Sequence, residues 1–156
     1  MGNEPLILLV EDDADDEELA RVALERSPIP HRLQVVRDGA EALDRLFQHA
    51  GFVQGERETE PTPRLILLDL KLPKMNGLEV LELIRHDERT KLVPVVVFTS
   101  SAEERDLSES YRRGANAYIR KPVDFREYKQ LIADVSTFWI RHNQIPSPKG
   151  KQGWPD

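Results

Sequence analysis

The sequence predicts an α/β fold in which helices cover both faces of a doubly wound parallel sheet. Short aliphatic runs alternate along the chain with longer segments whose apolar residues recur with helical periodicity. This alternation is typical of successive strand and helix units in a parallel sheet. At 156 residues, the chain has the usual size of one domain with a single sizeable core.

Five strands are predicted, each from one aliphatic run. They cover Leu6 to Val10, Arg32 to Val36, Leu65 to Leu68, Val93 to Phe98 and Ala117 to Ile119. The first helix should begin near Asp13, which is a good N-cap residue with Asp16 three positions on, and should end before Pro28. The other helices are expected over Gly39 to Ala50, Gly77 to His86, Ala102 to Arg113 and Phe125 to Arg141.

Two segments fall outside this alternation. Gly51 to Pro63 is predicted to be a surface loop longer than most helix-to-strand connections, because it contains Gly55 and two prolines. After Asn143 the chain is too rich in proline and glycine to be helical. We therefore expect a main domain over residues 1–142 and a C-terminal tail or arm over residues 143–156.

Composition excludes several classes of function. The formal net charge of −6 argues against direct binding of nucleic acid, which needs a basic face. No apolar stretch approaches the length of a spanning helix, and the first residues lack the pattern of a signal peptide, so we expect a cytoplasmic protein without a membrane anchor. The absence of cysteine excludes disulfides and thiol catalysis.

Seven of the eight residues from Glu11 to Glu18 are acidic. Like charges repel, so such a cluster at the end of a buried strand needs a hard cation or a helix N-terminus to compensate it. Asp13 to Glu18 are explained as the cap and first turns of a helix. Glu11 and Asp12 precede that helix and are candidate site residues.

Polar side chains follow the predicted strands where the functional crevice of an open parallel sheet lies. Three carboxylates, a hydroxyl and an ammonium should converge there, from Glu11, Asp12, Asp69, Thr99 and Lys121. Carboxylates at one edge suit an octahedral Mg²⁺ ion that keeps positions for water or phosphate. Asp69 would then be a nucleophile toward a phosphoryl group, with Thr99 and Lys121 stabilising its charge.

These residues and their neighbours closely resemble the receiver domain of bacterial two-component response regulators, over roughly residues 5 to 141. Thr99 follows Asp69 by thirty positions, and Lys121 follows Thr99 by twenty-two. The matching segments are Val10-Glu11-Asp12-Asp13, Leu68-Asp69-Leu70-Lys71-Leu72-Pro73 with Asn76-Gly77, Val97-Phe98-Thr99-Ser100, and Gly114-Ala115-Asn116-Ala117-Tyr118-Ile119-Arg120-Lys121-Pro122. The resemblance implies a flavodoxin-like (βα)5 fold with strand order 2-1-3-4-5.

The resemblance also implies that Asp69 accepts a phosphoryl group from a histidine kinase. The Mg²⁺ ion would be bound by Asp12, by Asp69 and by the backbone carbonyl of Lys71, with Glu11 acting through water. Thr99 would be the switch hydroxyl and Tyr118 the switch aromatic, and Lys121 would contact the phosphoryl group. The Lys121–Pro122 bond is expected to be cis.

We expect no output domain after the last predicted helix. The resemblance is then to a single-domain regulator that binds a partner or relays its phosphoryl group to a histidine phosphotransfer protein. We expect a phosphoacceptor that catalyses only its own phosphotransfer and dephosphorylation. The long loop, the Phe138-Trp139 pair and the tail resemble regulators paired with phytochrome-type histidine kinases. A homodimer is expected, with Trp139 and Trp154 as candidate contacts, although most aromatic residues of the last strand and helix should be core.

Three alternatives exist to a receiver domain that is phosphorylated. A haloacid dehalogenase type phosphatase needs a second acid two residues after its nucleophile, and that position is Lys71. A flavodoxin would place its flavin phosphate after the first strand, where Glu11, Asp12 and Asp13 would repel it. A receiver fold that serves as a binding module without phosphorylation is left open by the sequence.

Overall fold

The computed structural model describes residues 4–48 and 61–146, and its five strands form one parallel sheet in the order β2-β1-β3-β4-β5. The strands are β1 (Leu6–Val10), β2 (Arg32–Val36), β3 (Leu65–Leu68), β4 (Val95–Thr99) and β5 (Ala117–Arg120). The predicted flavodoxin-like strand order 2-1-3-4-5 is therefore confirmed. β4 begins two residues later than predicted, because Pro94 has no N–H to donate to a neighbouring strand.

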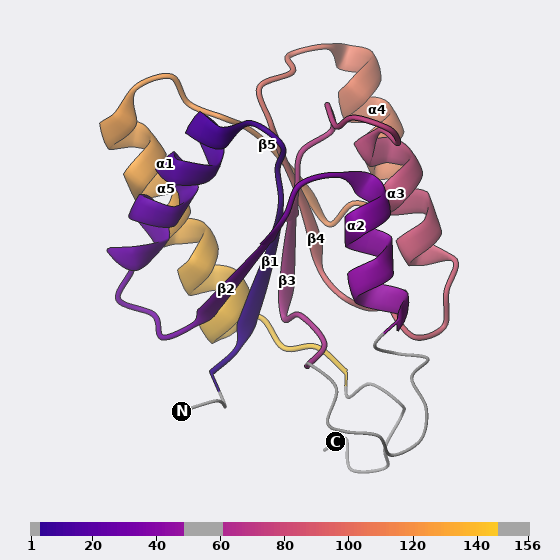
Figure 1. Ribbon diagram of the computed structural model, residues 1–156. Helices are drawn as coiled ribbons and strands as arrows, with labels where there is room; N and C mark the ends of the chain where they lie inside the picture. The colour runs from indigo at the N-terminus through magenta and orange to yellow at the C-terminus, as the bar shows by residue number, and fades with distance from the viewer. Residues whose placement is uncertain (1–3, 49–60, 147–156) are drawn as a thin grey trace.

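Helices cover both faces of this sheet (Figure 1). They are α1 (Ala14–Glu25), α2 (Gly39–Leu43), α3 (Gly77–Arg85), α4 (Glu104–Arg112) and α5 (Phe125–Ser136), and π-helical turns η1 (Asp44–Gln48) and η2 (Thr137–His142) extend α2 and α5. α1 and α5 lie side by side on one face, while α2, α3 and α4 cover the other. Asp13 caps α1 as predicted, because its carboxylate accepts the N–H groups of Asp15 and Asp16.

The sheet separates two apolar cores. In β1, Ile7 and Leu9 pack toward α1 and α5, whereas Leu8 and Val10 pack toward α2 and α3. Successive side chains of a strand point to opposite faces, so every residue of β1 is buried. The parallel direction of the strands brings all their carboxyl ends to one edge, where the polar residues that follow them can meet.

The connection from β3 to α3 is closely packed. The Gly77 N–H donates to the Leu70 carbonyl at 2.9 Å, and a Cβ at this position would lie 2.4 Å from the Asp69 carbonyl oxygen. Asn76 caps α3 and forms a reciprocal capping box with Glu79. The backbone of Asp69 is therefore held firmly between the end of β3 and the start of α3.

The aromatic residues near the C-terminus divide between core and surface. Tyr128 is buried, Trp139 is partly buried against the core beside α1 and α5, and the Phe138 side chain is 49% exposed. Of the candidate dimer contacts, Trp154 lies outside the described residues, as do positions 51–60 of the predicted long loop. Within the described ranges, no helix is both long and apolar enough to cross a membrane.

Candidate functional site

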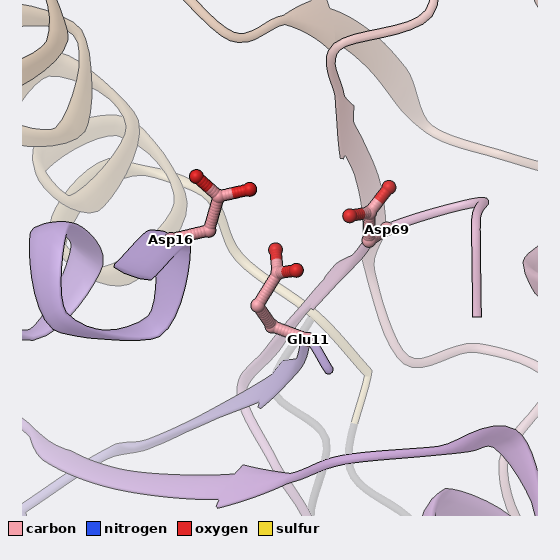
Figure 2. A group of neighbouring side chains, drawn as sticks. All are labelled: Glu11, Asp16 and Asp69. Carbon is pink, nitrogen blue, oxygen red and sulfur yellow. The ribbon is translucent and has the colours of Figure 1, made fainter. Parts of the chain in front are cut away.

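Three carboxylates converge at the carboxyl edge of the sheet. Glu11 follows β1, Asp69 follows the neighbouring β3, and Asp16 lies in the first turn of α1. One oxygen from each lies within 4.8 Å of the others, and Figure 2 shows the three groups directed toward a common space. Glu11 is 2% exposed and Asp69 is 7% exposed, so this concentration of negative charge is largely removed from water.

The ammonium of Lys121 binds all three of these carboxylates. Its Nζ lies 2.7 Å from Glu11 Oε1, 3.0 Å from Asp16 Oδ2 and 3.1 Å from Asp69 Oδ2. The lysine side chain is 7% exposed, and its ammonium lies 5.7 Å from the centre of the Phe98 ring. Because an ammonium carries three N–H donors, each carboxylate can receive one.

Burial and charge perturb two groups of this cluster. Burial raises the pKa of Glu11 to about 7, and the negative charge of Asp69 adds to this effect, while the hydrogen bond from Lys121 opposes it. Burial disfavours the charged form of Lys121, but its hydrogen bond to Glu11 and the charges of Asp69 and Glu11 outweigh burial and raise its pKa. Lys121 therefore remains an ammonium, and Glu11 is a carboxylate that readily takes up a proton.

The other oxygen of Asp69 faces the loop after β3. Asp69 Oδ1 accepts the Lys71 N–H at 3.3 Å, and the Asp69 N–H donates to the Val10 carbonyl at 3.1 Å. The predicted ligand Lys71 is thus next to Asp69, with its side chain exposed to water. Both oxygens of the candidate phosphoacceptor are oriented by protein donors.

Thr99 and Tyr118 meet at the loop that follows β4. The Thr99 side chain is fully buried, and its hydroxyl accepts the Ser101 N–H at 3.3 Å. The Tyr118 hydroxyl donates to the Ser101 carbonyl at 3.0 Å, and burial raises the pKa of Tyr118. The Ser101 hydroxyl donates to Asp106 Oδ2 at 2.5 Å, so this loop is tied to both β5 and α4.

The structure brings together a different acid from the one that the sequence suggested. Asp12 is exposed and is not among the three converging carboxylates, whereas Asp16 is. Asp16 was assigned to the first turns of the helix, where acidic residues are common without any other role. The available signal was its position three residues after the N-cap, in the first turn of the helix that follows β1.

The predicted cis bond between Lys121 and Pro122 is wrong. No cis peptide bond occurs in residues 4–48 or 61–146, so this bond is trans. The trans form of a bond before proline is intrinsically preferred by about 0.5 to 1 kcal/mol, and the turn after β5 accommodates it.

Comparison with known proteins identifies the family. Residues 7–133 match the response regulator receiver domain. The chain belongs to this family. Over 143 residues it is 40% identical to the probable methanogenesis regulatory protein FilR2 of Methanothrix harundinacea, covering 92% of this chain and 88% of FilR2. It is 39% identical over 142 residues to the response regulator Rcp1 of Synechocystis, covering 91% of this chain and 93% of Rcp1.

Solved structures of receiver domains have the same fold. The phosphorylated cyanobacterial phytochrome response regulator RcpA has a TM-score of 0.82 and 40% identity, with coverage of 92% of this chain and 99% of RcpA. The Mn²⁺-bound form of Rcp1 has a TM-score of 0.80 and 39% identity, with coverage of 92% and 99%. This receiver domain is therefore a two-component signalling protein related to phytochrome response regulators.

The acidic cluster is compatible with aspartate phosphorylation and with a divalent cation. Three carboxylates face one ammonium, so two negative charges are uncompensated when all the carboxylates are ionised. Their oxygens are the ligands that hard divalent cations prefer. Because Lys121 already contacts all three, a cation must use oxygens that this ammonium leaves accessible.

Proposed function

We propose that this receiver domain accepts a phosphoryl group from a histidine kinase on Asp69, with Mg²⁺ bound, and then binds a partner or relays the group onward. One observation carries the proposal. The Asp69 carboxylate lies 3.1 Å from the Lys121 ammonium in a nearly buried acidic cluster, within the part of the chain that matches the receiver domain. The phosphorylated state of the relative RcpA supports it.

The proposed reaction is an attack by an Asp69 oxygen on the phosphorus of a phosphohistidine. The P–N bond breaks and its electron pair returns to the imidazole, while a P–O bond forms with the carboxylate. Lys121 compensates the negative charge around the transferring group, and the Thr99 hydroxyl supplies a hydrogen bond once it turns away from the loop. The same groups would assist water in removing the phosphoryl group, so the protein acts only on itself.

We propose Mg²⁺ as the divalent cation of this site. Asp12, Asp69 and the Lys71 backbone carbonyl would bind it, and Glu11 would contact it through water. The exposure of Asp12 supports this assignment, because an exposed carboxylate is accessible to a cation. A bound divalent cation supplies positive charge that draws the phosphoryl group to Asp69 and shields its oxygens.

The proposed switch runs from Thr99 to Tyr118. In this structure the Thr99 hydroxyl accepts a hydrogen bond from the Ser101 N–H at 3.3 Å. Phosphorylation would draw the hydroxyl away from this N–H and toward the phosphoryl group. The Ser101 carbonyl in the loop after β4 accepts a hydrogen bond from the Tyr118 hydroxyl. Displacement of this loop would therefore alter the surface formed by α4, β5 and α5. That surface is the proposed output of this receiver domain.

The proposed kinase partner is of the phytochrome type, because RcpA is a phytochrome response regulator. FilR2, which is equally similar in sequence, is a probable methanogenesis regulatory protein, so the type of kinase has to be tested by experiment. Phosphotransfer profiling against the histidine kinases of the same genome would answer it. We also propose a histidine phosphotransfer protein as the acceptor of the phosphoryl group.

The protein is further proposed to form a homodimer with contacts at Trp139 and, through the tail of residues 143–156, at Trp154. Truncation after Asn143 should then lower the association state measured by sedimentation.

Phosphorylation by a small phosphodonor tests the central claim. With Mg²⁺, the wild-type protein should gain one phosphoryl group, measured by intact mass spectrometry, and Asp69→Asn should gain none. Asp15→Asn is the matched control, because Asp15 is exposed and its side chain pairs with no described residue. Equal labelling of Asp69→Asn and wild type would refute Asp69 as the acceptor, and absence of labelling in all variants would favour an unphosphorylated binding module.

A further inference from the structure

Asp16 contributes the third contact of the Lys121 ammonium. Glu11 and Asp69 approach it from the ends of two neighbouring strands, whereas Asp16 approaches it from α1, at 3.0 Å. The Asp16 side chain is 35% exposed, against 3% for Glu11 and 9% for Asp69. It is therefore the member of the cluster that lies at the boundary with water.

The position of Asp16 is fixed by its backbone. Its N–H donates to the Asp13 carboxylate at 3.0 Å, within the N-cap of α1, and α1 is packed against α5. Lys121 is restrained as well, because its own N–H donates to the Thr99 carbonyl at 2.7 Å and its ammonium lies beside the Phe98 ring. The carboxylates of Glu11, Asp16 and Asp69, from three separate parts of the fold, therefore hold the ammonium in one place.

The surroundings of two of these carboxylates, Asp69 and Glu11, change when Asp69 is phosphorylated. This step of the inference rests on the proposed function. Asp69 becomes an acyl phosphate and loses its carboxylate charge, and Glu11 lies next to the proposed cation. The Asp16 carboxylate is bonded neither to the phosphoryl group on Asp69 nor to the proposed cation. It can keep one N–H of Lys121 occupied while another N–H turns to the phosphoryl oxygens.

We propose that Asp16 is a positioning residue, which holds the Lys121 ammonium beside Asp69 and so keeps it ready for the transferring phosphoryl group. Preorganised charge next to a reacting atom increases the rate because it does not have to be reoriented during the reaction. Asp16 acts through Lys121 and does not itself touch the reacting atoms. This role separates it from Asp15, an exposed acid of the same turn that only favours the helix N-terminus.

Asp16→Asn and Asp15→Asn form a matched pair for the test. Each removes one negative charge from the first turn of α1, but of these two side chains Asp16 contacts Lys121, whereas Asp15 pairs with no residue that the structure describes. With saturating Mg²⁺ and a small phosphodonor, Asp16→Asn should be phosphorylated about fivefold more slowly than Asp15→Asn, as expected from loss of a partly exposed ion pair. Equal rates in the two variants would overturn the proposal.

A second measurement does not depend on phosphorylation. In ¹⁵N-labelled, unphosphorylated protein, an ammonium held by three carboxylates exchanges its protons slowly and gives a side-chain resonance, which Lys121→Arg would assign. That resonance should persist in Asp15→Asn and be lost or broadened in Asp16→Asn, while both variants keep the thermal unfolding midpoint within a few degrees. If the wild-type protein accepts no phosphoryl group, the proposed function fails, and an unchanged Lys121 resonance in Asp16→Asn would independently sink the positioning role.

Discussion

The ammonium of Lys121 donates a 2.7 Å hydrogen bond to Glu11, and both side chains are almost completely buried. This pair lies at the carboxyl edge of the sheet, where Asp69 adds a second buried carboxylate. The single ammonium of Lys121 faces three carboxylates, so negative charge exceeds positive charge at this site when all three are ionised. The predictions about pH and cations follow from that excess of negative charge.

Glu11→Gln should reduce the loss of stability with rising pH. The folded-state pKa of Glu11, about 7, lies above its ordinary value of 4.5. Its contribution to the free energy of unfolding is therefore fully present below about pH 4.5 and is lost as pH rises through about 7. Between pH 5 and 8, urea unfolding without divalent cations should show the wild type losing about 1 to 3 kcal/mol relative to Glu11→Gln.

Mg²⁺ provides the control for this pH effect. Added Mg²⁺ should stabilise the wild type more at pH 8 than at pH 6, because protonation of Glu11 competes with the cation. The difference should be smaller in Glu11→Gln. Stability curves that stay parallel from pH 5 to 8 would contradict the raised pKa of Glu11.

Gly77→Ala should destabilise the fold, although alanine in a helix normally stabilises it by about 0.5 to 1 kcal/mol relative to glycine. The added Cβ would lie 2.4 Å from the Asp69 carbonyl oxygen and 2.7 Å from the Leu70 Cα, both of which belong to the backbone. We expect a loss of about 2 kcal/mol or more in urea unfolding, together with slower phosphorylation.

Glu82→Ala is the control for that substitution, because Glu82 is an exposed residue of the same helix whose ion pair with Arg113 lies at the surface. It should change the free energy of unfolding by no more than about 0.5 kcal/mol. A Gly77→Ala protein that is more stable than wild type would show that the close approach has no cost.

Asp106→Ala should loosen the loop between β4 and α4. The N-cap residue Glu103 makes no side-chain capping bond, but its N–H donates to the Ser101 hydroxyl, which in turn donates to Asp106 at 2.5 Å. Removing the carboxylate should accelerate amide hydrogen exchange at the start of α4 and cost about 1 kcal/mol. Glu104→Ala, an exposed acid of the same turn, should leave exchange nearly unchanged, and equal exchange in both variants would argue against this capping role.

Tyr128→Phe should leave stability unchanged or raise it by up to about 1 kcal/mol. The Tyr128 side chain is buried, and its hydroxyl makes no hydrogen bond within the described part of the chain. The ring itself packs against Phe98 with centroids 5.5 Å apart, and phenylalanine would keep that contact. Tyr111→Phe, at a side chain that is 52% exposed, is the matched control, and a loss above about 1 kcal/mol in Tyr128→Phe alone would reveal a partner for the hydroxyl.

Local pattern was enough to predict the order of strands and helices in this receiver domain. The strand bounds Leu6–Val10 and Leu65–Leu68 agree with the aliphatic runs, because these strands are buried on both faces of a covered sheet. The edge strand Arg32–Val36 also has the predicted bounds, although it is mostly only partly buried. The Asp13 cap was predictable for the same local reason. The contact between Asp69 and Lys121 was predictable because polar residues directly after parallel strands meet at one edge, whereas the role of Thr99 stays a prediction.

Side-chain direction could not be obtained from these patterns. Whether Asp12 or Asp16 joins the cluster around Lys121 depends on how the start of α1 is placed beside the sheet, which is set only when α1 packs in the tertiary structure. The trans bond at Lys121–Pro122 likewise depends on the turn between β5 and α5, since the intrinsic preference between isomers is small. The burial that raises the pKa of Glu11 arises only when helices cover the sheet, since a carboxylate in an open chain stays in water.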